Sequence, residues 1–228
     1  MPDPGPVLAD LARHVDISCV QAQHARADID ELVRQAVAGG FVSAHVLPEW
    51  LEYLRERLEG TGVLAGSPVS FPSGGATTAT KVAEASELLS LGAQELDVVV
   101  AIGRLRSGDD AYVTDELAAI VEVVDGRVPL RAILEVGRLD DDDIRRGVDA
   151  AIEAGVPWIK TGTGWSGVAT TIEHIRLIAD RADGRAALKA AGGIRDLDTV
   201  RAMAELGVTR FGMNATAALA AVAATKDQ

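Results

Sequence analysis

The stretch AIEAGVPWIKTGTG, residues 151–164, contains the pattern that decides the fold of this chain. A helix-like segment stops at Gly155, and a short apolar run then ends at Lys160, directly before a turn of small residues. The same succession of helix, glycine and strand recurs in AVAGGF (36–41), LLSLGAQELD (88–97) and MAELGVTRFG (203–212). A chain that repeats this joint alternates helices with parallel strands, so the α/β class is predicted.

The repeats extend over nearly the whole chain. Strand-like runs are expected near residues 14–20, 41–47, 63–71, 95–102, 130–136, 158–161, 187–190 and 209–213. Helix-like segments are expected at residues 29–38, 49–58, 77–91, 110–124, 141–154, 171–181 and 197–205, with a last one from Ala215.

Eight such units without a linker predict one domain over residues 1–228, a closed (β/α)8 TIM barrel. A doubly wound open sheet is the alternative, but the first strand–helix turn lacks the G-x-G-x-x-G pattern of dinucleotide-binding sheets. The proline-rich start predicts a loose tail over residues 1–7.

Composition excludes several classes of partner. The chain has 22 Lys and Arg against 34 Asp and Glu, a net charge of −12, which argues against nucleic acid and against an anionic membrane surface. A single cysteine, Cys19, rules out an internal disulfide and fits a reducing compartment. No apolar run approaches the length of a membrane span, and no signal peptide pattern opens the chain. We therefore expect a soluble, cytoplasmic protein.

The few lysines are the most informative residues. The chain contains only four, and two of them, Lys160 and Lys189, end the apolar runs VPWIK (156–160) and AALK (186–189). An amine at the end of a buried strand is an expensive placement. Lysine, unlike arginine, can lose its proton there and become a neutral nucleophile.

A barrel would bring these two amines together. The carboxyl ends of the strands converge on one face, and adjacent strands lie about 4.8 Å apart. Each amine would then disfavour the charge of the other. In ELDVVV (95–100), alternation places Asp97 on the same face as Val99, so a carboxylate suited to proton transfer is expected to face the lysines. Asp16 and Glu135 occupy comparable positions in their strands.

Each residue also has a simpler interpretation. A lysine beside a turn is most often a solvated strand end, and an aspartate in a strand is often a hydrogen-bonded structural carboxylate. The coincidence of Lys160, Lys189 and Asp97 at three strand ends of one predicted barrel favours the catalytic interpretation.

The motifs resemble those of the deoxyribose-phosphate aldolase family. PWIKTGTGWSGVAT (157–170) resembles the family's Schiff-base motif, and LKAAGGIRD (188–196) its second-lysine motif. GAQELDVVVAIGRLRSGD (92–109) resembles the strand that bears the catalytic aspartate, and SFPSGGATTATKVAEA (70–85) the F-P-x-G segment. The similarity runs from about Leu8 to Leu219 and implies a TIM barrel.

The resemblance implies a class I aldolase that catalyses a reversible aldol reaction without a metal or other cofactor. By position, Lys160 matches the lysine that forms the Schiff base, Lys189 the lysine that keeps it neutral, and Asp97 the carboxylate of the proton relay. The four histidines and Cys19 show no metal-ligand spacing. Residues expected to bind substrate are Asp16, Ser18, His45, Glu135, Thr163, Trp165, Gly192, Gly193, Gly212 and Asn214.

Several positions depart from the family pattern, and four of them concern the expected substrate pocket. Gly162 replaces the usual serine, Trp165 follows where a small, polar or basic residue is common, His45 replaces a cysteine, and Asn214 stands where relatives place serine. Together these changes surround the acceptor end of the expected pocket. We expect the Lys160 chemistry to be kept and the acceptor or phosphate pocket to be altered, in favour of a bulkier or unphosphorylated aldehyde.

Three functions stay open at this stage. The first is an aldolase acting on a 2-deoxy sugar phosphate or a related small aldehyde in carbohydrate metabolism. The second is a Schiff-base lyase or C–C bond-forming enzyme of a specialised pathway, acting on an unphosphorylated substrate. The third is a pseudo-aldolase that binds a sugar phosphate as a regulator or scaffold. Barrels of this size often pair as homodimers, although the sequence maps no interface.

Overall fold

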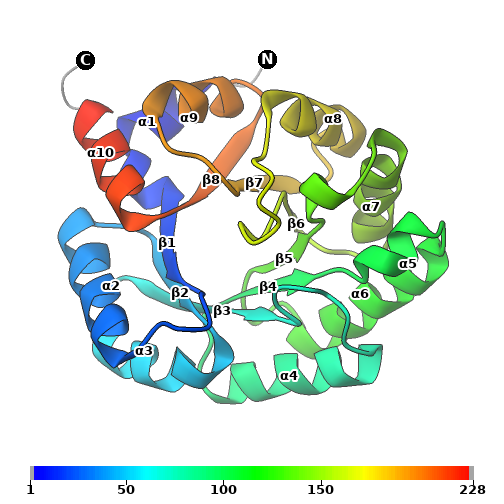
Figure 1. The fold of residues 1–228 in the computed structure, drawn as a ribbon, viewed down its shortest axis with the longest axis horizontal. Helices are drawn as coiled ribbons and strands as arrows, with labels where there is room; N and C mark the ends of the chain where they lie inside the picture. Colours follow the sequence, from blue (N-terminus) through cyan, green and yellow to red (C-terminus); the bar gives the residue numbers. More distant parts are fainter. Residues whose placement is uncertain (1–2, 226–228) are drawn as a thin grey trace.

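The computed structural model describes residues 3–225, which form a closed barrel of parallel strands in the order β1 to β8 (Figure 1). The strands are β1 (Val15–Cys19), β2 (Ser43–Val46), β3 (Leu64–Val69), β4 (Glu95–Val99), β5 (Leu130–Ile133), β6 (Trp158–Lys160), β7 (Ala187–Ala191) and β8 (Val208–Met213). The predicted (β/α)8 TIM barrel is confirmed.

Helices surround the barrel. They are α1 (Gly5–Ala9), α2 (Arg26–Gly39), α3 (Leu51–Leu58), α4 (Thr78–Ser90), α5 (Ile102–Arg106), α6 (Asp110–Val124), α7 (Asp141–Glu153), α8 (Ile172–Ala182), α9 (Leu197–Ala204) and α10 (Ala215–Thr225). Short 3-10 turns occur at η1 (Leu11–His14), η2 (Pro48–Trp50) and η3 (Val136–Arg138). Among residues 3–225, no helix combines the length and the apolar character needed to cross a bilayer.

Two details differ from the sequence-based prediction. The loose tail was predicted through residue 7, but α1 begins at Gly5, and Val7 is only 6% exposed because it packs against the core. Residues 1–2 of that tail lie outside the described residues. The short helix α5 after β4 was also missed, because five residues are too few to show a helical period.

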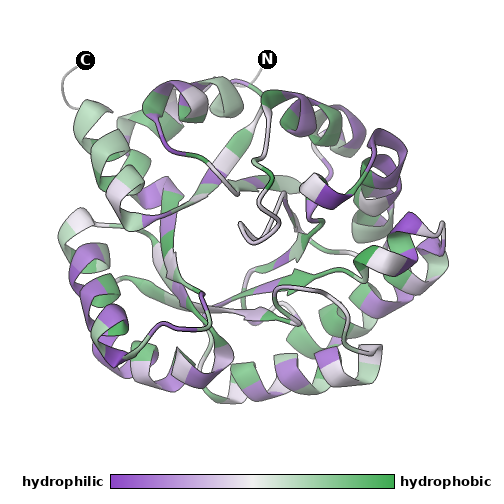
Figure 2. Ribbon diagram, viewed as in Figure 1, coloured by the Kyte–Doolittle hydropathy of each residue, from purple (hydrophilic) through white to green (hydrophobic). Residues whose placement is uncertain are grey.

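The apolar core lies between the barrel and its helices. Ile17, Ala44, Leu96 and Ile159, from four different strands, are each at most 1% exposed and belong to this cluster. Outer helices such as α7 and α8 carry both hydrophobic and hydrophilic residues along their length, as amphipathic helices do (Figure 2). The strand side chains that face the helices therefore form the apolar core. The side chains that face the barrel interior can then be polar.

Strand register brings the predicted catalytic residues together. Lys160 of β6 pairs directly with Lys189 of β7, and Asp97 of β4 pairs with Arg131 of β5. A register shift between Leu188 and Lys189 brings Lys189 beside Arg210 of β8. The two lysines are therefore register partners on neighbouring strands, as expected if the barrel brings them together.

Candidate active site

A cavity of about 370 Å³ opens inside the barrel at the carboxyl ends of the strands. Ten of the residues predicted as site residues line it: Asp16, Ser18, His45, Asp97, Lys160, Thr163, Gly192, Gly193, Gly212 and Asn214. Lys189, Glu135 and Trp165 are not among the lining residues, and each takes a different place around the cavity.

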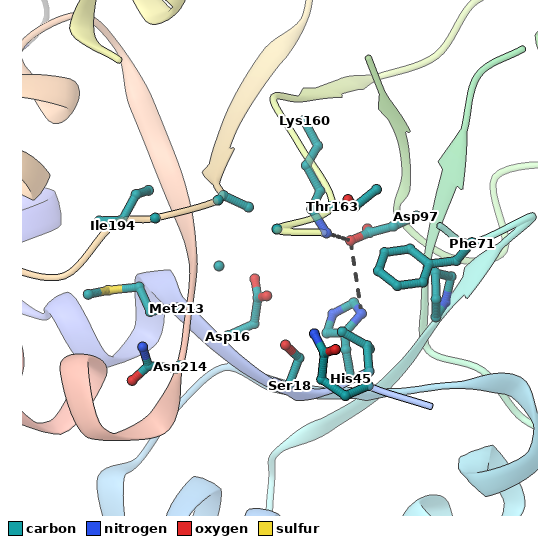
Figure 3. Close-up of a pocket in the computed structure, with 18 of the residues that line it drawn as sticks. Asp16, Ser18, His45, Phe71, Asp97, Lys160, Thr163, Ile194, Met213 and Asn214 are labelled. Carbon is teal, nitrogen blue, oxygen red and sulfur yellow. Dashed lines mark hydrogen bonds and ion pairs between the residues drawn. The ribbon is translucent and has the colours of Figure 1, made fainter. Parts of the chain in front are cut away.

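The Asp97 carboxylate joins the two lysines. Lys160 Nζ donates to Asp97 Oδ2 at 2.7 Å, and Lys189 Nζ donates to the same oxygen at 3.0 Å. Lys160 reaches the cavity with 12% of its side chain exposed, whereas Lys189 is 0% exposed and lies beneath it. Figure 3 shows the ends of Lys160, Asp97 and His45 pointing toward one another across the cavity. One carboxylate oxygen can therefore pass a proton between the two amines.

Burial disfavours the charge of the deeper amine. It lowers the pKa of Lys189 to about 8, although Asp16 and Asp97 attract the charged form, and the charges of Lys160 and Arg131 oppose it further. Lys189 also lies 3.0 Å from Asp16 Oδ1. Lys189 therefore releases its proton more readily than an exposed lysine does.

Asp97 is held as a carboxylate. Burial alone would raise its pKa, but attraction to Lys160, Lys189 and Arg131 outweighs burial and keeps the pKa well below its usual range. Arg131 Nη1 donates to Asp97 Oδ1 at 3.0 Å. Because Oδ1 is fixed by the guanidinium, Oδ2 remains directed at the amines.

His45 stands between the cavity and the barrel interior. Its Nε2 lies 3.1 Å from Glu95 Oε2, and its Nδ1 lies 4.0 Å from Asp97 Oδ2. A Cβ on Gly66 of β3 would come within 2.3 Å of the imidazole. The missing side chain at Gly66 therefore makes room for the histidine that stands where the resembled family usually has cysteine.

A second group of buried charges lies deeper in the barrel, and we refer to Glu95, Arg131 and Arg210 as the lower tier. Glu95 accepts hydrogen bonds from both arginines, at 2.8 Å from Arg131 Nη2 and at 3.0 Å from Arg210 Nη1. Arg210 Nη2 also donates to Ser43 Oγ at 3.1 Å and to Asp16 Oδ1 at 3.3 Å. Burial would raise the pKa of Glu95, but the hydrogen bond with His45 and the two guanidinium charges lower it well below its usual range.

Sequence reasoning missed the lower tier. Glu95 and Arg131 open or follow the start of their strands, where charged residues commonly face solvent. One signal was present: Glu95, Asp97 and Val99 alternate along one strand, so the face assigned to Asp97 also carries Glu95.

The loop after β6 is anchored from two sides. Glu135 Oε2 accepts from the backbone N–H of Thr163 at 3.2 Å and from the Thr163 hydroxyl, and the N–H of Thr170 donates to Gly192 O at 2.9 Å. Between these anchors Trp165 donates from Nε1 to Val20 O at 3.2 Å. Figure 1 shows this segment reaching over the barrel opening. Glu135 thus positions the loop rather than lining the cavity.

Trp165 lies at the rim. Its ring meets Phe71 edge to face, with centroids 6.0 Å apart, and 38% of the residue is exposed. Val20 and Phe71 both line the cavity, so these contacts lie at its edge.

The opposite end of the cavity is formed by the turns after β7 and β8. Gly192 and Gly193 have φ of +98° and +83°, which side chains other than glycine rarely adopt. Arg195, which was not predicted, lines this end together with Ile194. Asn214 caps α10, because its Oδ1 accepts from the Ala217 N–H at 2.9 Å. Backbone N–H groups and an exposed guanidinium make this end suited to an anion.

Other cavity residues escaped the sequence-based prediction, and they come mainly from loops: Val20, Gln21, His24, Pro68, Phe71, Gly164, Ala191, Ile194, Arg195 and Met213. Within residues 3–225, no three His, Cys, Asp or Glu side chains are grouped so as to hold a metal ion.

The chain resembles known aldolases in sequence. Residues 12–215 match the family described as DeoC/LacD family aldolase. A deoxyribose-phosphate aldolase of Sinorhizobium medicae is 51% identical over 211 residues, which cover 92% of this chain and 85% of that protein. A deoxyribose-phosphate aldolase of Klebsiella pneumoniae is 47% identical over 207 residues, covering 90% of this chain and 83% of the relative.

Solved structures agree with the sequence comparison. The tetrameric deoxyribose phosphate aldolase of Aeropyrum pernix superposes with a TM-score of 0.86 at 28% identity, covering 96% of this chain and 92% of that one. An aldolase termed QR15 superposes with a TM-score of 0.88 at 31% identity, covering 96% of both chains.

Proposed function

This chain belongs to the DeoC/LacD family of aldolases, and on that premise we propose that it cleaves 2-deoxyribose 5-phosphate through a Schiff base on Lys160. The observation that carries the proposal is the contact of both Lys160 and Lys189 with one oxygen of Asp97, beside an open cavity. This arrangement supplies a nucleophilic amine, a neighbouring amine that can accept its proton, and a carboxylate between them.

The reaction begins when neutral Lys160 attacks the aldehyde carbon, C1, of the open-chain sugar. The resulting carbinolamine loses water and becomes an iminium ion, which acts as an electron sink. Asp97 and Lys189 together accept the proton of the C3 hydroxyl, the C2–C3 bond breaks, and its electrons form an enamine on Lys160. The first product is glyceraldehyde 3-phosphate. Protonation of the enamine at C2 and hydrolysis of the imine then release acetaldehyde and restore Lys160.

The anion-suited end of the cavity would hold the phosphate. With C1 on Lys160, the chain of the sugar extends toward the turns after β7 and β8. Backbone N–H groups at Gly192 and Gly193 and the guanidinium of Arg195 would meet the dianion there. Asp16 and Ser18 lie between the two ends and are suited to bond the sugar hydroxyls.

Borohydride trapping tests the nucleophile. The protein is incubated with acetaldehyde, reduced with borohydride and analysed by intact mass and peptide map. We expect an adduct on Lys160 that is lost in Lys160→Ala. Lys81→Ala is the matched control, because Lys81 is buried outside the barrel and should leave the adduct in place. An adduct only on another lysine, or none with any aldehyde tried, would contradict the proposal.

Substrate comparison tests the phosphate. We expect the kcat/KM for 2-deoxyribose 5-phosphate to exceed that for 2-deoxyribose. Arg195→Ala should lower the ratio of these two kcat/KM values by roughly 10-fold or more, because it removes a charge-assisted hydrogen bond to the phosphate. If 2-deoxyribose is cleaved as well as its phosphate, the second proposal, an unphosphorylated aldehyde bounded by Trp165, is favoured. That result would keep the Lys160 chemistry and change only the acceptor.

We also expect the chain to pair with a second copy. Val37 on α2 and Leu219 on α10 are 44% and 38% exposed, and these two helices are in contact. Analytical ultracentrifugation of the parent and of Leu219→Glu would measure the oligomeric state. We expect the parent to form dimers and Leu219→Glu to weaken them, and a parent that is monomeric at all concentrations would refute the expectation.

A further inference from the structure

We propose that the lower-tier arginines, Arg131 and Arg210, act as positioning residues that keep one amine of the lysine pair neutral. They form ion pairs with the carboxylates that would otherwise keep both amines protonated. This inference rests on the proposed function, because it concerns the amine that performs the attack. The proposed reaction uses Lys160, Lys189 and Asp97, and none of its steps involves a residue of the lower tier.

The charges of the barrel interior are unequal. Four cationic groups face three carboxylates: Lys160, Lys189, Arg131 and Arg210 against Asp16, Glu95 and Asp97. All seven side chains are at most 12% exposed, so water can screen them only weakly. A buried set with one excess positive charge loses it most easily by releasing a proton from lysine, because arginine does not deprotonate.

The strands contribute these charges from nearly every side. Carboxylates come from β1 and β4, arginines from β5 and β8, and lysines from β6 and β7. β2 contributes Ser43 and His45, and the histidine can add only positive charge, which leaves the excess in place. β3 contributes no charged side chain at this level. Glu135, after β5, binds Thr163 through Oε2, whereas the ion pairs of Lys160 and Lys189 are with Asp97 and Asp16.

Geometry links the arginines to the amines through shared carboxylates. Arg131 bridges Glu95 and Asp97 with its two terminal nitrogens, at 2.8 Å and 3.0 Å. Arg210 bridges Glu95 and Asp16 at 3.0 Å and 3.3 Å. Both carboxylates that bind Lys189 are therefore also bound from below. In agreement, the positive charge of Arg131 is one of the causes that lower the pKa of Lys189.

The experiment measures the titration of the amines without requiring turnover. The folded enzyme is treated with formaldehyde and borohydride over a pH series, and the rate of methylation at Lys160 and at Lys189 is read from peptide masses. Only a neutral amine reacts, so the midpoint of the rate against pH reports its protonation. The acid limb of kcat/KM for 2-deoxyribose 5-phosphate is measured in parallel.

The proposal predicts opposite signs for two substitutions. Arg131→Gln leaves three cations and three carboxylates, so the midpoint should rise by about one pH unit, which lowers the neutral fraction near pH 7 about tenfold. Glu95→Gln leaves the excess larger, so the midpoint should fall. The double variant Arg131→Gln with Glu95→Gln restores an excess of one and should return the midpoint close to that of the parent.

Two further variants separate charge from structure. Arg131→Lys keeps the charge but loses the forked geometry, and should leave the midpoint near that of the parent even if kcat falls. Glu116→Gln alters a buried ion pair outside the barrel and should not move the midpoint. If Arg131→Gln fails to fold, Glu95→Gln still decides the matter.

Midpoints that stay unchanged in Arg131→Gln and Glu95→Gln, or that move in the same direction, would overturn the proposal. These outcomes differ from a failure of the proposed function. A parent enzyme that does not cleave the sugar phosphate would refute that function, while the methylation midpoints would still test the lower tier.

Discussion

Lys81 and Lys189 are both fully buried, and both bind carboxylates, yet they lie on opposite sides of the barrel wall. Lys81, on α4 outside the strands, donates to Val99 O at 2.7 Å and to Glu116 at 2.8 Å. Lys189, inside the barrel, shares two carboxylates with three other cations. We refer to Lys81 and Glu116 as the outer pair, in which one cation faces one anion. The inner group consists of the four cations and three carboxylates inside the barrel, and it carries one excess positive charge beside the cavity. The same placement of lysine therefore serves stability in one region and reactivity in the other.

Replacement of each lysine by methionine should separate the two regions most strongly. Lys189→Met removes the partner amine, so kcat/KM should fall by roughly 10²- to 10⁴-fold, the range of a general acid–base group. Its stability loss should be small, because three cations still face three carboxylates. Lys81→Met should lower the free energy of unfolding by about 3–5 kcal/mol, because it leaves Glu116 buried without a counter-charge.

Urea unfolding and steady-state kinetics on both variants check this prediction, with activity expressed per folded molecule. We expect Lys81→Met to keep its activity within about tenfold of the parent, since Lys81 does not reach the cavity. If Lys81→Met lost activity without losing stability, the separation between the two regions would be wrong.

A second substitution should restore stability at the outer pair but should not restore activity in the inner group. Lys81→Met combined with Glu116→Gln removes both charges and keeps an acceptor for the Ala101 N–H, which Glu116 bonds at 3.1 Å. We expect the double variant to recover about 2 kcal/mol of the loss caused by Lys81→Met, because no buried charge stays unpaired. Lys189→Met combined with Asp97→Asn should recover no activity. A double-mutant cycle on unfolding free energy and on kcat/KM measures both. Additive losses at the outer pair would contradict the prediction.

The sequence predicted the inner group better than the outer pair for a physical reason. Lys160 and Lys189 stand at the ends of apolar runs beside small-residue turns, and such joints mark the strand ends where a barrel forms its site. Lys81 lies in a polar helical segment, where nothing in the pattern distinguishes a buried amine from a solvated one. Its partner Glu116 is 35 residues away along the chain, so the pair exists only through the packing of α4 against α6.

The same limit explains the lower tier and the loops. Strand alternation indicates which face Glu95 shares, but the pairing of Arg131 and Arg210 with it depends on barrel closure and on the register shift at Lys189. Phe71 and Val20 meet Trp165 across the opening, a contact between loops that no periodicity encodes. The helix boundaries were predicted closely where glycines end the helices, as at Gly155, and less well at α5, where no such signal occurs.

Acid unfolding should reveal the smallest difference between the two regions, and it should have opposite signs in them. The pKa of Glu95 lies below its usual value, so unfolding takes up a proton at acid pH, and the stabilisation present above about pH 4 is lost as the pH falls. Burial raises the pKa of Glu116, so its contribution is present at low pH and is lost as the pH rises through the raised value. Urea unfolding between roughly pH 3 and pH 6 measures the slopes. Glu95→Gln should flatten the fall in stability toward acid pH, by at most about 1.4 kcal/mol per pH unit for one proton, whereas Glu116→Gln should leave that fall as steep or steeper. If both substitutions flattened the fall equally, Glu95 and Glu116 would have pKa values shifted in the same direction. The excess of cations inside the barrel would then not be what lowers the pKa of Glu95.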